Sequence, residues 1–176
     1  MAALLLGTIS ACQAVEQPVG MTMLFLNKGN FAIGVKRFDP DGQRGPVPGY
    51  LGAEPNDNRN QGGAQMSFMP GDSKRGMPQF VEVEWFQETA ESKALQESVQ
   101  QPQGTVTKQL WDDYLRKLEE VRERGFTYRK RIDLTPILTS VLIAQARNNP
   151  KTTNIKLVVI FKDDQVSIEA MPEKWR

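Results

Sequence analysis

Apolar and polar residues alternate over several short segments of this chain, and a period of two predicts β-strands. The clearest segment is 79–86, in which Val81, Val83 and Trp85 share one face while Glu82 and Glu84 share the other. Similar patterns or short apolar runs predict strands at 21–27, 31–38, 64–69, 126–134, 154–161 and 166–170. The chain is therefore expected to be dominated by β-structure.

Turn-forming residues separate these segments. Residues 27–30 predict a hairpin turn between the first two strands, 39–42 end the second strand, and 162–165 join the last two. Connections of hairpin length favour antiparallel pairing.

A different period predicts two helices. In residues 105–124, apolar side chains recur at spacings of three and four, and Gly125 follows as a typical residue after a helix end. Pro136 suits the start of a second helix at 136–148, whereas only part of the polar, Gln-rich segment 87–104 is expected to be helical. We expect an α+β, β-dominated fold in which residues 21–176 form a single globular domain, an antiparallel sheet or sandwich with two packed helices.

The start of the chain has the pattern of a bacterial lipoprotein signal. A short apolar run ends in Ser10 and Ala11, and Cys12 is the only cysteine. We expect residues 1–11 to be a signal peptide, Cys12 to be the lipidated residue, and residues 12–20 to be a tether. The alternative is an ordinary buried cysteine, because free cysteine is among the most buried residue types.

Gln13 follows this cysteine. In such lipoproteins an Asp at this position retains the protein at the inner membrane, so Gln13 predicts the periplasmic face of the outer membrane. The first apolar run is shorter than the ~20 residues that a membrane-spanning helix needs.

The amino-acid composition limits which activities and partners are expected for this protein. The chain of 176 residues contains 22 basic and 21 acidic residues, and its net charge of +1 indicates no general attraction to nucleic acid. Histidine is absent, which excludes a His-based general base, a Ser-His-Asp triad and an ordinary zinc site. We therefore expect no enzymatic activity and no cofactor.

Two clusters resemble metal or catalytic sites. Residues 39–42 and 56–60 each begin like a calcium loop but lack the later ligands in register, so turn chemistry is favoured. Glu82 and Glu84 share a strand face as an acid–base pair would, although solvent-facing charges on a half-buried strand explain them as well.

Two further groups suggest contacts with a partner. Arg129 and Arg131 could meet an anion, but a solvated role or pairing with acids of the 105–124 helix is favoured. Trp111 and Tyr114 could anchor a partner, but packing of that helix onto the sheet is favoured.

Residues 39–63 form a Gly- and Pro-rich segment of a length that is uncommon inside compact domains. Such loops are either functional or merely irregular, and both readings stay open. If the loop is functional, a rigid sheet would present it as a recognition surface. Our candidate partner-binding residues there are Arg44, Tyr50, Glu54, Asp57 and Arg59.

Several stretches of the chain together resemble a group of small proteobacterial lipoproteins. They are a strand ending in Asp41-Gly42, a Gly62-Gly63 stretch, the segment 81–85, the segment 157–161 and the final strand. Members of that group resemble the immunity lipoproteins of type VI secretion lipase effectors.

The resemblance implies a periplasmic, lipid-anchored immunity protein. Such a protein would bind a cognate antibacterial phospholipase and occlude its active site with a loop. Two alternatives remain open, namely a structural envelope lipoprotein and a carboxylate-based hydrolase that uses Glu82 and Glu84.

Overall fold

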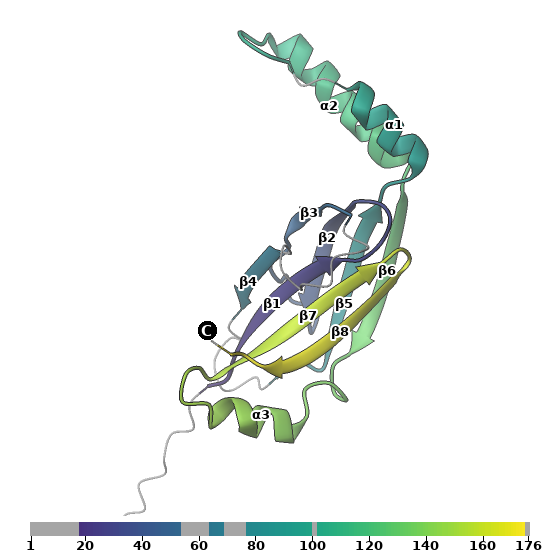
Figure 1. Ribbon diagram of the computed structural model, residues 1–176. Coiled ribbons are helices and arrows are strands. Elements are labelled where there is room, and N and C mark those ends of the chain that lie inside the picture. The colour runs from purple at the N-terminus through teal and green to yellow at the C-terminus, as the bar shows by residue number, and fades with distance from the viewer. Residues whose placement is uncertain (1–17, 54–63, 69–76, 100–101, 175–176) are drawn as a thin grey trace, which may run out of the picture.

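The computed structural model describes residues 18–53, 64–68, 77–99 and 102–174 of the chain. Its strands form two four-stranded sheets that face each other (Figure 1). The first sheet has the order β4 (Ala64–Phe68), β1 (Gly20–Asn27), β7 (Asn154–Lys162) and β8 (Gln165–Pro172). The second has the order β3 (Gly49–Leu51), β2 (Ile33–Pro40), β5 (Phe80–Gln87) and β6 (Phe126–Asp133). The predicted β-dominated α+β class is confirmed.

The first sheet is not purely antiparallel. Its central strands β1 and β7 run parallel, with Met23 opposite Leu157 and Phe25 opposite Val159. Every residue of β1 is buried, which explains why its sequence is a continuous apolar run rather than an alternation. A strand that is covered on both faces is typical of a central parallel pair.

The expected hairpin between β1 and β2 is wrong. The two strands belong to different sheets, so residues 28–32 carry the chain across the sandwich. The Asn27 side chain fixes this corner, because its Nδ2 donates to Phe31 O at 2.9 Å and its Oδ1 accepts from Gly29 N at 3.0 Å. An Asn that bonds to nearby backbone serves a corner as well as a hairpin turn, so the turn residues alone do not distinguish the two.

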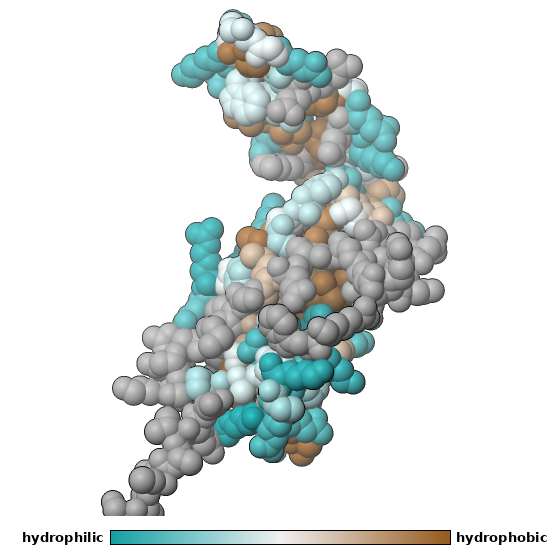
Figure 2. Space-filling model, turned by 60° about the vertical axis from the view of Figure 1, so that its left-hand side comes forward, coloured by the Kyte–Doolittle hydropathy of each residue, from teal (hydrophilic) through white to brown (hydrophobic). Residues whose placement is uncertain are grey.

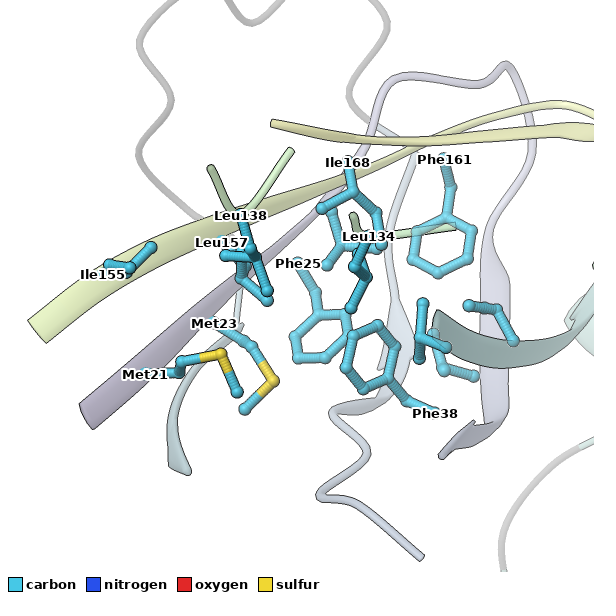
Figure 3. Packing of buried hydrophobic residues seen from close by; sticks show 14 of the residues in the cluster. Met21, Met23, Phe25, Phe38, Leu134, Leu138, Ile155, Leu157, Phe161 and Ile168 are labelled. Carbon is cyan, nitrogen blue, oxygen red and sulfur yellow. The ribbon is translucent and has the colours of Figure 1, made fainter. Parts of the chain in front are cut away.

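The core lies between the sheets (Figure 3). Phe25 of β1 meets Phe38 of β2 edge to face at 5.2 Å between ring centroids, and Trp85 of β5 meets Phe161 of β7 at 5.5 Å. Both pairs connect one sheet to the other. Trp85 is fully buried, so the inward face predicted for the 79–86 segment is confirmed.

The chain between β5 and β6 forms a helical hairpin of α1 (Ala90–Ser98) and α2 (Lys108–Glu123). This helical hairpin projects from the end of the second sheet (Figure 1). The third helix, α3 (Ser140–Arg147), instead lies against β7 and β8. The helix predicted at 105–124 exists, but the favoured packing of Trp111 and Tyr114 onto the sheet is wrong: Gln87 of β5 pairs with Phe126 of β6, so the intervening helices start where the sheet ends.

Candidate functional site

Local hydrogen bonds fasten the two helices of the hairpin to each other at its base. Thr89 caps α1, because its Oγ1 accepts from Ser92 N at 3.0 Å while Ser92 Oγ accepts from Thr89 N at 2.7 Å. This reciprocal pair resembles a capping box. Thr89 Oγ1 also donates to Arg124 O at 3.0 Å, and Arg124 forms an ion pair with Glu91. The start of α1 is thereby fastened to the end of α2.

Close packing also fixes the base. A Cβ at Gly125 would lie 2.0 Å from the Phe86 ring, so no side chain fits between this glycine and β5. Gly125 does not have a positive φ, and its role is close approach rather than the left-handed conformation expected after a helix. Phe86 is consequently buried although it points out of the sandwich core, and Val121 of α2 is buried as well.

A hollow of about 430 Å³ lies between the outer face of the second sheet and the last turns of α2. We call it the notch. Residues of β2, β3, β5 and α2 line it, among them Gly34, Lys36, Tyr50, Phe86, Leu118 and Val121. Gly34 and Gly49 have open space where a Cβ would be, so the floor of the notch is bare backbone that a ligand can approach closely.

An apolar stripe extends the notch along α2. Trp111, Leu115 and Leu118 follow one another at spacings of four and three, which places them on one side of a helix. Trp111 is 40% exposed and Leu115 is 47% exposed. Figure 2 shows apolar residues gathered on the helical hairpin and along the hollow beneath it. The amphipathic pattern of α2 is therefore real, but its apolar side is open.

Polar groups border the notch on the sheet side. Tyr50 donates a hydrogen bond to the buried carboxylate of Glu88 at 2.9 Å. Lys36 places its Nζ 5.9 Å from the centroid of the Phe86 ring, within the range of a cation–π contact. The notch thus combines apolar walls with two acidic residues, Glu88 and Glu119, and one cation, Lys36, and apolar walls with a few polar groups are common in ligand-binding pockets.

The structure separates the residues proposed from sequence. Tyr50 is 57% exposed on β3 at the edge of the notch. Arg44 borders a smaller hollow with Lys36, Arg37 and Asp39. Glu54, Asp57 and Arg59 lie outside the described residues, as do Cys12 and the 56–60 motif. The segment 39–63 is also interrupted by β3, so it is not one continuous loop.

The outward charges of the second sheet are engaged with one another. Arg129 binds Glu84 on the neighbouring strand with its Nη2 at 2.6 Å from Oε2, and Arg37 binds Glu82 at 3.2 Å. Arg131 stacks on the Phe80 ring at 3.5 Å. The favoured intramolecular role of the basic cluster is supported, although the acid comes from β5 rather than from the helix.

Two aspartates of the 39–42 turn organise backbone and neighbouring side chains. Asp41 has a φ of 47° and accepts from Gln79 N at 2.9 Å and from Phe80 N at 3.2 Å. Asp39 is hydrogen-bonded to Arg37, and this contact, with the nearby carboxylates, raises the pKa of the Arg37 guanidinium. Turn chemistry therefore accounts for Asp41, whereas an ion pair within β2 accounts for Asp39. No group of three or more potential metal ligands occurs in the part of the chain that the structure describes.

The open face of α2 was not predicted from the sequence. The helix and its apolar side were predicted, but that side was expected to lie in the core. A signal was present, because α2 has charged residues at every position outside its apolar face except Gln109 and follows a polar segment, a pattern that suits a helix standing in solvent as well as one on a sheet.

Comparisons with protein-family models, with characterised proteins and with solved structures give no match for this chain. Within the described ranges, no helix has both the length and the apolar character required to cross a bilayer.

Proposed function

We propose that this protein is a non-catalytic binding protein that holds a segment of another protein in the notch and along the apolar stripe of α2. The observation that carries the proposal is the exposure of Trp111 and Leu115 on a helix that stands away from the core. Contiguous exposed apolar side chains of this kind mark interaction sites, and Trp is enriched among the residues that dominate binding energy.

The specific partner that we propose is a secreted antibacterial phospholipase, which makes the protein an immunity lipoprotein anchored through Cys12. The support is the sequence resemblance, whose stretches lie largely on β2, β5, β7 and β8. The helical hairpin lies outside these stretches, so we assign recognition of the individual toxin to it and to Tyr50 at the notch edge.

The geometry gives less support to a hydrolase. Glu82 and Glu84 both form ion pairs with arginines of adjacent strands, whereas a general acid and base pair requires two carboxylates with different environments and access to a substrate. Full function of a Glu84→Gln variant would remove the hydrolase alternative.

The test is a pull-down from the native envelope with the full chain and a double variant, Trp111→Ala with Leu115→Ala. We expect a lipase-like partner with the parent chain and at least roughly 30-fold weaker binding with the double variant, because such anchors are worth about 2 kcal/mol or more. The purified lipase should lose activity when the complex forms.

The matched control is Val141→Ala, which truncates an equally apolar, 65% exposed side chain on α3. Its binding should equal that of the parent. Equal binding by the double variant and the parent would refute the assignment of the surface. Recovery of envelope assembly proteins in place of a lipase would refute immunity and favour a scaffolding lipoprotein.

A further inference from the structure

A second hollow of about 400 Å³ lies at the base of the helical hairpin. Four parts of the chain meet there: the connection between β1 and β2, the end of β5 with the start of α1, the start of β6, and the turn between β7 and β8. We call it the basal pocket and define it by Gln87, Glu88, Phe126, Tyr128, Asp163 and Asp164. It is distinct from the notch, although Glu88 borders both.

The basal pocket is acidic and lacks a matching cation. The acidic residues Glu88, Asp163 and Asp164 border it, and no Lys or Arg is among the described residues that line it. The carboxylate of Glu88 is hydrogen-bonded to Tyr50 at the edge of the notch. Glu88 is only 5% exposed, and its hydrogen-bond donor is the neutral Tyr50 hydroxyl. Asp163 accepts from Asn30 N at 3.3 Å. Buried or clustered carboxylates are costly without a positive partner, so this site favours a cationic ligand.

Aromatic rings form the other wall. Phe126 and Tyr128 lie 6.3 Å apart between ring centroids, and Phe126 is 59% exposed. Phe31 also borders the pocket. A ring face attracts a cation, and aromatic rings beside carboxylates are the usual surroundings of a bound organic cation.

Gln87 adds an independent observation. Its side chain is 6% exposed, and its Oε1 is the one buried side-chain polar atom among the described residues that has no hydrogen-bond partner. A buried acceptor without a donor is destabilising. Gln87 is among the residues that line the basal pocket, so a ligand with N–H groups that binds there would supply the missing donor.

We propose that the basal pocket binds the guanidinium group of an arginine side chain from the partner protein. A guanidinium is planar and stacks on aromatic rings, and it has five N–H donors for several acceptors at once. A quaternary ammonium has no donor for Gln87 or the carboxylates. A lysine ammonium is more strongly hydrated and stacks less well. The statement that this arginine belongs to a partner protein rests on the proposed function.

The pocket itself can be tested without the partner. The full chain, labelled with ¹⁵N, is titrated with N-acetyl-arginine N-methylamide, and the amide signals of residues 87–90, 126–128 and 163–164 are followed by NMR. We expect saturable shifts in these signals. The corresponding citrulline derivative, which is isosteric but uncharged, and choline should each bind at least roughly fivefold more weakly.

Three substitutions test whether the arginine derivative binds in the basal pocket. Asp164→Asn and Phe126→Leu should each weaken binding of the arginine derivative by roughly fivefold. Gln87→Met should also weaken this binding, but without lowering the melting temperature, because the substitution removes an unpaired buried acceptor. Glu169→Gln is the control, since it removes an exposed carboxylate of β8 outside the pocket and should bind as the parent does.

Unsaturable shifts, or equal binding of the arginine and citrulline derivatives, would overturn the proposal. So would binding of free arginine but not of the capped derivative, because the ligand would then be an amino acid rather than a protein side chain. Saturable binding here together with no effect of the Trp111 and Leu115 substitutions on partner capture would refute the proposed surface and leave the pocket intact.

Discussion

Single residues secure the ends of the elements in this protein. Asp133 closes β6, and its Oδ1 accepts hydrogen bonds from the hydroxyl of Thr135 and, at 2.9 Å, from Thr135 N. The first of these bonds is the main cause of a lowered pKa of Asp133 relative to its ordinary value of 3.8, and the second adds to it. The carboxylate form is therefore the one that supports the turn toward α3.

Thr135→Val is expected to raise the pKa of Asp133 toward its ordinary value, because the larger of the two contributions is removed. A group whose folded pKa is lowered stabilises the fold above its unfolded pKa, and this contribution is lost as the pH falls through the folded pKa. The difference in unfolding free energy between parent and variant should thus shrink below about pH 4. NMR titration of the Asp133 carboxyl and denaturation at several pH values check both statements. A pH-independent difference would contradict this account.

Gly125 is a second residue whose role is steric. Gly125→Ala would force a Cβ into the Phe86 ring, and overpacking of this kind costs about 1–3 kcal/mol. Chemical denaturation should show this loss. Gly34→Ala is the matched control, because an added Cβ there meets open space, and it should leave the stability unchanged or raise it by up to about 1 kcal/mol. Equal losses for the two variants would show that Gly125 is not limited by Phe86.

At the scale of elements, the helical hairpin is an insertion in a β-hairpin. Gln87 and Phe126 are directly opposite on β5 and β6, so a two-residue turn would join the two strands in the same register. The helical hairpin meets the sandwich at Gly125 and Phe86, while the buried cluster that joins the sheets includes no residue of α1 or α2. The sandwich should therefore fold without them.

Replacement of residues 88–125 by Asn-Gly, combined with Phe86→Thr to keep the exposed position polar, tests this independence. We expect a folded domain with one cooperative unfolding transition and no capture of the partner. Circular dichroism and thermal denaturation check the fold, and the pull-down checks the binding. A shortened chain that fails to fold cooperatively would show that the helical hairpin belongs to the core.

Some elements of this fold could be predicted from the sequence and others could not. Strands β5, β7 and β8 were predicted within a few residues, since alternation or apolar runs with clear turns specify them. The position of α2 was not predicted, because an apolar stripe has the same pattern whether a sheet or a partner covers it. The pairing of β1 with β7 has no local signal either, since 126 residues separate Asn27 from Asn154.

At the scale of the whole molecule, the β-sandwich carries the helical hairpin at one end, and the candidate binding residues lie at that end. Aromatic pairs between the sheets form the core, while the exposed apolar side chains of α2 and the acidic residues Glu88, Asp163 and Asp164 gather at the end that carries the helical hairpin. Of the residues proposed from sequence, Tyr50 lies at this end. The candidate site was otherwise missed because it is assembled from β2, β3, β5, β6, α2 and the β7–β8 turn.

The parallel pairing of β1 with β7 also has a consequence for biosynthesis. The first strand leaves the ribosome, or any translocation channel, long before the strand that completes its sheet. Contacts between distant parts of a chain form slowly because a large loop must close first. β1 is an apolar segment whose edge toward β7 would stay unpaired throughout this interval, so we expect the nascent protein to need a chaperone or rapid delivery to avoid aggregation.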